Sequence, residues 1–320
     1  RIRYQLQIED HALRVISHRV GQADGSFMLR LSPRPGLQVD DGIGRDVVLV
    51  TDISGSMGGD PLTESKEGLL SIVSQLSERD RFEVVAFDDQ SYPLFGKLEA
   101  VNRASRRRAR AQIDSLEVRG GTNIHGALIR AVELLDASKA PARGQAIIFL
   151  TDGMGSTPPD VITAELRQRA PEIRIFPFGA GKGVNRAFLQ RLAEENRGVA
   201  TFVDEEHSIG EAMRSLYERI AMPVLVDLEL ETRGLQVHSI FPERLPDLYR
   251  DSEVIVFGRY SQPGEGSIAL KGKLRDQEVR YDLKVEFLDA QPAHPYIEKL
   301  WASRRIDQLM GKQLSHGQQP

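Results

Sequence analysis

The stretch that decides the fold is VVLVTDISGSMGG, residues 47–59. A run of branched apolar residues ends here in Asp52, and Ser54 and Ser56 follow at intervals of two. Burying a carboxylate and hydroxyls without partners is unfavourable, so oxygen atoms at the end of a buried strand require a partner. The nature of that partner distinguishes a structural turn from a binding site.

The segment around this stretch, from Arg45 to Asp204, alternates between short apolar runs and amphipathic helical stretches. Such alternation predicts a parallel sheet with helices on both faces. Runs that are continuously rich in Val, Ile and Phe are typical of central strands covered on both sides. We assign these strands to residues 46–52, 81–89, 146–152 and 173–179, with a short further strand at 199–203. The predicted fold class is α/β, with a doubly wound, mostly parallel sheet.

The flanks have a different pattern, because residues 1–43 and 222–290 contain alternating strands and turn signals without helical periodicity. We predict one all-β sandwich built from both flanks, with the α/β domain of residues 44–221 inserted in it. The two ends of a domain often lie close together, which makes such an insertion economical. Residues 291–320 are expected to form a C-terminal helix, from Pro295 to Met310, and a loose polar tail.

Composition excludes several classes of function. The 320 residues are 40% hydrophobic and 28% charged, as in globular proteins of about two domains. The net charge of −4 gives no attraction to nucleic acid, and we interpret the basic run at 106–110 as a solvated helix face. The absence of cysteine excludes disulfides, thiolate metal sites and thiol nucleophiles. No apolar stretch is long enough to span a membrane, and the start Arg-Ile-Arg resembles an excised fragment, which leaves export open.

Polar residues follow the ends of two predicted central strands. Asp52 and Asp152 close the strands that end in VTD and LTD, and the two serines follow the first of them. In a doubly wound sheet, ligands bind beyond the carboxyl ends of the strands. A third polar loop, RGGTNIHGA at residues 119–127, has paired glycines that would let Thr122 approach closely. We therefore expect these side chains to share one crevice.

Two carboxylates in one crevice repel each other unless a positive charge lies between them, and Arg119 is the only lysine or arginine in these loops. A hard divalent cation meets this requirement, because hydroxyl and carboxylate oxygens suit Mg²⁺, Mn²⁺ or Ca²⁺ and not Zn²⁺ or copper. Mg²⁺ is our first choice of cofactor. The predicted metal site consists of Asp52, Ser54, Ser56, Thr122 and Asp152.

The D-I-S-G-S motif at 52–56, Thr122 in GGTN and Asp152 in LTDG together resemble the metal-ion-dependent adhesion site of a von Willebrand factor type A domain, over roughly residues 44–221. The resemblance implies that the two serines bind the metal directly and that the threonine binds directly or through water. It implies that the two aspartates act mainly through coordinated waters. It also implies one open coordination position for an acidic group on a ligand.

A narrower resemblance reaches beyond this domain. The segments FLQRLAEENRGVATFV (188–203), DSEVIVFGRY (251–260) and HPYIEKLWASRRIDQLM (294–310) resemble inter-alpha-trypsin inhibitor heavy chains and their bacterial relatives. In that family a VIT domain precedes the A domain, and here it is absent or reduced to the strands of residues 1–40. Functions of the VIT domain are therefore not carried over. The lack of cysteine favours a bacterial member, with an extracellular, cell-surface or periplasmic location.

These features predict a metal-dependent protein-binding module and not an enzyme. An Asp or Glu of a protein partner would complete the coordination sphere, and loop residues around the metal would supply selectivity. Exposed methionines adapt to varied apolar partners. We predict a ligand-binding rim of Met57, Asn123, His125 and Met154. The alternative is an intracellular assembly factor whose A domain docks an ATPase, as in metal chelatase subunits, but the β flanks and closing helix favour the first hypothesis.

Three other interpretations compete with a metal site. The aspartate and serines of 52–56 could cap backbone amides in a turn, which would leave Thr122 and Asp152 unexplained. Ser-His-Asp hydrolysis with His125 lacks a G-x-S-x-G elbow, and a cation-bound serine is not an activated nucleophile. His125 also suits a helix start or the surface, and Asn123 suits a helix cap. Neither a phosphate-binding loop nor a dinucleotide motif follows the first strand.

Overall fold

The computed structural model describes residues 6–8, 11–33, 44–138, 140, 143–153, 155–181, 183–204, 207–221, 223–250, 252–274 and 277–316. The chain divides into two compact units, Asp41–Glu218 (the α/β unit) and Arg1–Asp40 together with Arg219–Gln319 (the β unit). None of the helices in the described ranges is long and apolar enough to cross a membrane.

The α/β unit is built on a mixed sheet with the strand order β10-β9-β8-β4-β5-β6, and β7 also pairs with β5. Its strands are β4 (Arg45–Asp52), β5 (Arg81–Phe87), β6 (Ser91–Pro93), β7 (Glu99–Ala100), β8 (Gly144–Thr151), β9 (Arg174–Ala180) and β10 (Thr201–Val203). The five strands from β10 to β5 are parallel, whereas β6 and β7 are antiparallel to β5. The predicted doubly wound, mostly parallel sheet is thereby confirmed.

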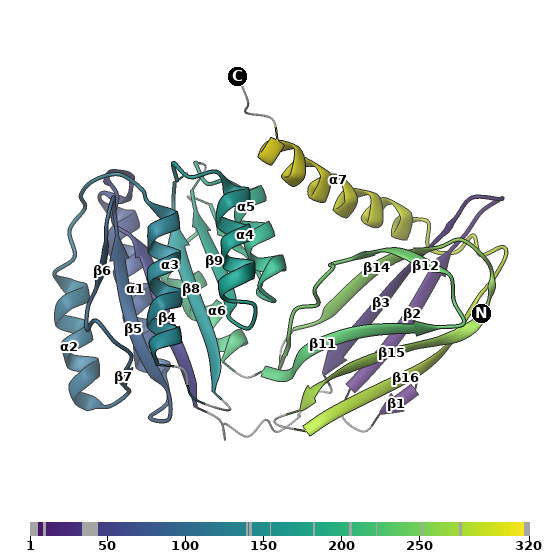
Figure 1. The fold of residues 1–320 in the computed structure, drawn as a ribbon, viewed down its shortest axis with the longest axis horizontal. Coiled ribbons are helices and arrows are strands. Elements are labelled where there is room, and N and C mark those ends of the chain that lie inside the picture. Colours follow the sequence, from purple (N-terminus) through teal and green to yellow (C-terminus); the bar gives the residue numbers. More distant parts are fainter. Residues whose placement is uncertain are drawn as a thin grey trace. The chain divides into compact units, whose positions relative to one another are not determined.

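Helices cover both faces of this sheet (Figure 1). They are η1 (Gly55–Met57), α1 (Asp60–Gln75), α2 (Arg103–Asp114), α3 (Ile124–Ala137), α4 (Pro159–Arg169), α5 (Arg186–Glu195) and α6 (Ile209–Ile220). Val48 and Val50 of β4 share a core with α3, α4 and α5. Thr51 points to the opposite face, where its hydroxyl lies 2.9 Å from that of Ser65 in α1. Because β4 is buried on both faces, its central residues 47–50 are all apolar and do not alternate with polar residues.

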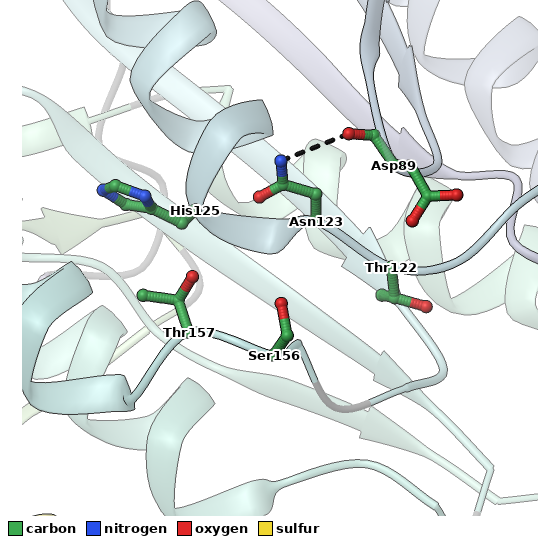
Figure 2. A pocket seen from close by; sticks show the side chains of 6 residues that line it. All are labelled: Asp89, Thr122, Asn123, His125, Ser156 and Thr157. Carbon is green, nitrogen blue, oxygen red and sulfur yellow. Dashed lines mark hydrogen bonds between the residues drawn. The ribbon is translucent and has the colours of Figure 1, made fainter.

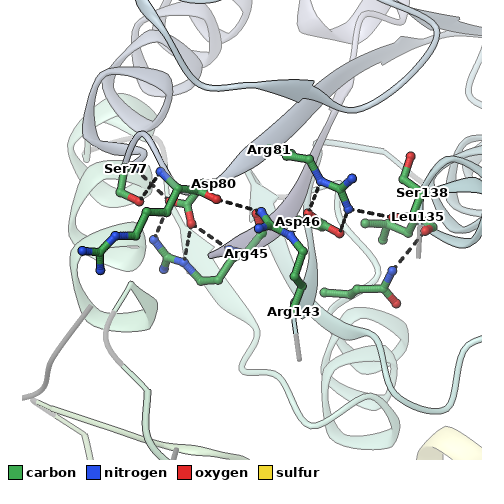
Figure 3. A network of polar contacts seen from close by, with 10 residues as sticks. Arg45, Asp46, Ser77, Asp80, Arg81, Leu135, Ser138 and Arg143 are labelled. Carbon is green, nitrogen blue, oxygen red and sulfur yellow. Dashed lines mark hydrogen bonds and ion pairs between the residues drawn. The ribbon is translucent and has the colours of Figure 1, made fainter. Parts of the chain in front are cut away.

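At the amino ends of the strands, ion pairs tie neighbouring elements together (Figure 3). The carboxylate of Asp46, at the start of β4, accepts hydrogen bonds from Arg81 Nε at 2.8 Å, Arg81 Nη2 at 2.6 Å and Arg143 Nε at 2.7 Å. Beside it, Arg45 Nη2 donates to Asp80 Oδ2 at 3.0 Å. We call these five residues the amino-end network. They fix the starts of β4, β5 and β8 relative to one another.

The β unit is a sandwich of two antiparallel sheets, with the strand orders β1-β2-β3-β14-β12 and β13-β11-β15-β16. Its strands are β1 (Leu6–Ile8), β2 (His11–His18), β3 (Gly25–Pro33), β11 (Pro223–Arg233), β12 (Val237–Phe241), β13 (Leu248–Tyr249), β14 (Val254–Tyr260), β15 (Gly264–Leu274) and β16 (Gln277–Phe287). Tyr260 of the first sheet stacks on Phe287 of the second, with ring centroids 4.1 Å apart. Because β3 pairs with β14, both flanks contribute to one sandwich, as predicted.

A final helix, α7 (Tyr296–His316), belongs to the β unit. Ile297 is fully buried, and Trp301 Nε1 donates to the carbonyl of Ser239 at 3.0 Å, which attaches the helix to the sandwich. The helix was predicted to end at Met310, and that boundary is wrong, because α7 continues to His316. Gly311 costs only about 1 kcal/mol relative to alanine in a helix, and the lysine, glutamine and leucine that follow favour helix.

Candidate metal centre

The two aspartates of the predicted site lie at the same edge of the sheet. Asp52 is the last residue of β4, and Asp152 directly follows β8, the parallel neighbour of β4 in which Leu150 pairs with Thr51. The strand ends are linked by a side-chain hydrogen bond, in which Thr151 Oγ1 donates to Asp52 Oδ2 at 2.6 Å. This bond orients one carboxylate oxygen and leaves the rest of the edge open to the following loops.

A chain of polar contacts runs from one aspartate to the other through the two serines. The backbone amide of Ser54 donates to Asp52 Oδ1 at 2.8 Å, and the hydroxyls of Ser54 and Ser56 lie 3.1 Å apart. Ser56 Oγ then donates to Asp152 Oδ1 at 2.9 Å. A capping turn explains the first of these contacts. It does not explain the last, which joins the loops that follow two different strands.

The loop before α3 brings the fifth predicted ligand to the same edge. A Cβ atom placed on Gly153 would lie 3.7 Å from Thr122 Oγ1, so this hydroxyl sits beside the residue that follows Asp152. The loop is held by backbone contacts, including Asn123 N to the carbonyl of Asp88 at 2.8 Å. Within the described part of the chain, the Thr122 hydroxyl has no hydrogen-bond partner. It is therefore free to bind a metal or a water.

The electrostatics of this edge favour a cation. Burial raises the pKa of Asp52 above its usual range, although hydrogen bonds from Thr151 and Ser54 lower it in part, and the nearby Asp152 raises it further. Burial likewise raises the pKa of Asp152, partly offset by the bond from Ser56. Neither carboxylate has a lysine or arginine partner among the described residues. A positive charge placed between the two carboxylates would stabilise the ionised form of each.

The donor set fits a hard divalent cation. It contains two carboxylates and three hydroxyls, an oxygen-only set that suits Mg²⁺, Mn²⁺ or Ca²⁺. The described ranges contain no group of three or more His, Cys, Asp or Glu side chains that could hold a metal ion, at this edge or elsewhere, so the candidate centre depends on its hydroxyls. Arg119, the only arginine in the polar loops of the site, lies over the ring of Tyr92, with its guanidinium carbon 5.2 Å from the ring centroid. It forms no ion pair with either aspartate.

The predicted methionine rim is wrong at Met57. Its side chain is fully buried, because the short helix η1 turns it into the core of the α/β unit, whereas the preceding Ser56 is exposed. Burial of an apolar side chain is favourable, and its neighbours Gly58 and Gly59 leave room for the turn. Met154 lies outside the described residues.

The other two rim residues have structural partners. Asn123 caps α3, since its Oδ1 accepts from the amide of Gly126 at 2.9 Å, and its Nδ2 donates to the carbonyl of Asp89 at 3.2 Å. His125 Nε2 lies 2.7 Å from Glu165 Oε2 of α4. The alternatives that we noted for these residues, a helix cap and a helix start, describe their positions well.

Beside the candidate metal centre lies a polar pocket of about 510 Å³, shown in Figure 2. It is lined by Asp89, Thr122, Asn123, His125, Ser156 and Thr157. Our sequence analysis missed Asp89, Ser156 and Thr157 as site residues. A signal for Asp89 was present, because FDDQ at 87–90 follows the central strand β5 as VTD ends β4.

Comparison with known proteins defines the class of the α/β unit. Residues 45–202 match the family model described as the von Willebrand factor type A domain. The structure of a von Willebrand factor type A protein from Catenulispora acidiphila superposes with a TM-score of 0.69 at 18% identity, over 89% of this chain and 75% of that one. The ArnB paralog VWA2 from Sulfolobus acidocaldarius gives a TM-score of 0.61 at 16% identity, over 96% and 85%. The α/β unit therefore matches the von Willebrand factor type A domain in sequence and in fold.

The similarity extends over most of the chain to inter-alpha-trypsin inhibitor heavy chains. Heavy chain H4 of Homo sapiens is 29% identical over 290 residues, which cover 85% of this chain and 31% of that protein. Heavy chain H3 of Homo sapiens is 28% identical over 316 residues, which cover 92% and 35%. The chain spans about a third of the length of these relatives. The predicted resemblance to this family is confirmed.

Proposed function

We propose that this chain is a metal-dependent protein-binding module of the adhesion type. The observation that carries the proposal is the chain of polar contacts from Asp52 through the two serines to Asp152. It gathers two carboxylates that no lysine or arginine of the described residues neutralises. A purely structural turn has no need of two buried or half-buried carboxylates with raised pKa values. The von Willebrand factor type A fold supports the same proposal.

The cation would be held by oxygen atoms of five side chains, those of Asp52, Ser54, Ser56, Thr122 and Asp152. Mg²⁺ is the preferred ion, and Mn²⁺ or Ca²⁺ would suit the same donors. When bound, the cation supplies an electrophilic position for a carboxylate oxygen. Thr151 holds Asp52 in place through its hydrogen bond, and Ser56 positions Asp152. The few charges on the protein side leave the metal attractive to an acidic ligand.

The partner that fits such a site is a protein with an exposed Asp or Glu. The similarity to inter-alpha-trypsin inhibitor heavy chains supports a location outside the cytoplasm, at the cell surface, in the extracellular space or in the periplasm. The site contains no arrangement of an activated nucleophile with a base, because His125 lies against Glu165 and not against either serine. Binding is accordingly the function that the site supports best.

The proposal is tested by metal binding to the parent and to Asp152→Asn, which keeps an acceptor for Ser56 but removes the charge. At a hundredfold excess over its dissociation constant, Mg²⁺ should stabilise the parent by about 2.7 kcal/mol. Since about 1 kcal/mol shifts the melting temperature of a unit of this size by 2–4 °C, melting should rise by roughly 5–10 °C over EDTA. The variant should bind Mg²⁺ about 10- to 100-fold more weakly.

A matched control is Asp114→Asn, which changes the same kind of side chain at an exposed position of α2. It should respond to Mg²⁺ like the parent. Identical melting curves of the parent in EDTA and in Mg²⁺, with no heat of binding by calorimetry, would rule out the metal site.

A further inference from the structure

The pocket beside the candidate metal centre has a polar lining with one fixed negative charge. Among the described residues that line it, six in number, there is no apolar side chain, lysine or arginine, and Asp89 is the only carboxylate. In Figure 2, Asp89 and Thr122 lie at one end of the pocket, and His125 lies at the other. Its volume of about 510 Å³ is within the range of ligand-binding pockets.

The charge of Asp89 is not compensated by the described residues. Its carboxylate is exposed and accepts one hydrogen bond, from the backbone amide of Gly121 to Oδ2 at 2.9 Å. Arg119, in the loop that also contains Gly121, and Arg169 of α4 have other partners. Arg119 lies over Tyr92, and Arg169 pairs with Glu165 at 3.0 Å, the residue that also holds His125. A cation that enters the pocket from outside would therefore be its first ion-pair partner.

Two hydroxyls of the lining are free to bind. In the described ranges, the side chains of Ser156 and Thr157 make no hydrogen bond, whereas the hydroxyl of Thr122 is assigned to the proposed metal. The side-chain amide of Asn123, by contrast, already has two partners. Its Oδ1 accepts from the backbone at the start of α3, and its Nδ2 donates to the carbonyl of Asp89. The pocket thus combines one anionic acceptor with these hydroxyl acceptors. That combination matches a group with many N–H donors and a positive charge.

We propose that this pocket binds a basic side chain, arginine above lysine, on the same protein ligand whose carboxylate binds the metal. This inference rests on the proposed function. The charge of a bound divalent cation would equal that of the two aspartates of the centre. The ligand carboxylate and Asp89 would then be two neighbouring negative charges without a counter-charge. A guanidinium between them compensates this charge, and its five donors in a planar fork can reach both the carboxylate and the hydroxyls. The ligand is then a segment with an acidic and a basic side chain close together.

The test uses synthetic peptides with one aspartate and one arginine, one to four residues apart in either order, each paired with a counterpart that has neutral citrulline in place of arginine. Binding to the full chain is measured by fluorescence anisotropy in Mg²⁺ and in EDTA. At least one spacing should favour arginine over citrulline by about fivefold or more, the range expected of an exposed to half-buried ion pair. Asp89→Asn should abolish that preference, because asparagine keeps the acceptor for Gly121 but loses the charge. Asp114→Asn should retain it.

A second readout does not depend on the metal. The amide of Gly121 donates to the Asp89 carboxylate and so reports its surroundings in nuclear magnetic resonance spectra. Titration with agmatine in EDTA should shift the Gly121 and Asn123 amides of the parent and of Asp114→Asn, but not those of Asp89→Asn. Equal affinity of arginine and citrulline peptides, or an unshifted Gly121 amide, would overturn the pocket proposal. Loss of all Mg²⁺-dependent peptide binding with an intact agmatine response would instead refute the proposed function alone.

Discussion

Removal of the Asp46 carboxylate is expected to destabilise the α/β unit strongly and to leave the candidate metal centre intact. Asp46 is fully buried and accepts three charge-assisted hydrogen bonds of 2.6 to 2.8 Å in the amino-end network. Breaking a buried ion pair by deleting one partner costs about 3–5 kcal/mol, because the other charge stays uncompensated. The side chains of Arg81 and Arg143 are 28% and 21% exposed and can recruit water. We therefore expect Asp46→Ala to lower the free energy of unfolding by about 3 kcal/mol, the lower end of this range.

This loss corresponds to a fall in melting temperature of roughly 6–12 °C for a unit of this size, measured by calorimetry in EDTA. Glu133→Ala is the matched control, because Glu133 forms an exposed ion pair with Arg130 on α3 and should cost less than about 1 kcal/mol. The Mg²⁺-induced rise in melting temperature should persist in both variants, since Asp46 lies at the amino end of β4 and the metal centre at its carboxyl end. A fall below about 3 °C for Asp46→Ala, or loss of its Mg²⁺ response, would refute this reasoning.

Two further predictions concern the domain boundary and the effect of pH. Residues 44–221 expressed alone should give a soluble fragment that melts cooperatively, and an insoluble fragment would contradict the inserted-domain boundary. Because burial raises the pKa of Asp52 and Asp152 in the folded chain, protons compete with the metal at a higher pH than for ordinary carboxyls. The rise in melting temperature that Mg²⁺ causes should therefore shrink as the pH falls from 7 toward about 4. Over the same range, protonation of the two aspartates should lower the cost of burying them, so that they destabilise the metal-free fold less. A shift independent of pH would argue against both aspartates as metal-site residues.

The sheet could be predicted from the sequence because buried parallel strands appear in it as runs of consecutive apolar residues. The run at 46–52 has four consecutive apolar residues, 47–50, and β4 is buried on both faces. The same logic placed Asp52 and Asp152 at one edge, since parallel neighbours end together. It could have placed Asp89 there too, because β5 is the other neighbour of β4. The position of a residue at a strand end is thus predictable from pattern alone.

The direction of a loop side chain is not predictable in this way. Met57 was expected on the surface because it lies in the loop beside the predicted metal, but the turn η1 buries it, and no periodicity marks a three-residue helix. The partners of Asn123 and His125 depend on loops and helices up to 40 residues away in the chain. The end of α7 was misplaced because the polar residues after Met310 were interpreted as a loose tail, although their helix propensities are favourable apart from Gly311. Each of these depends on tertiary contacts or on weak local preferences.

The pairing of β3 with β14 has a consequence for synthesis on the ribosome. About 220 residues separate the end of β3 at Pro33 from the start of β14 at Val254. At translation rates of about 5–20 residues per second, the free edge of β3 waits roughly 10–45 s for its partner strand. The whole α/β unit emerges during that interval and can fold first. The nascent chain therefore carries an unpaired strand edge, open to pairing with other chains, until its second flank is made.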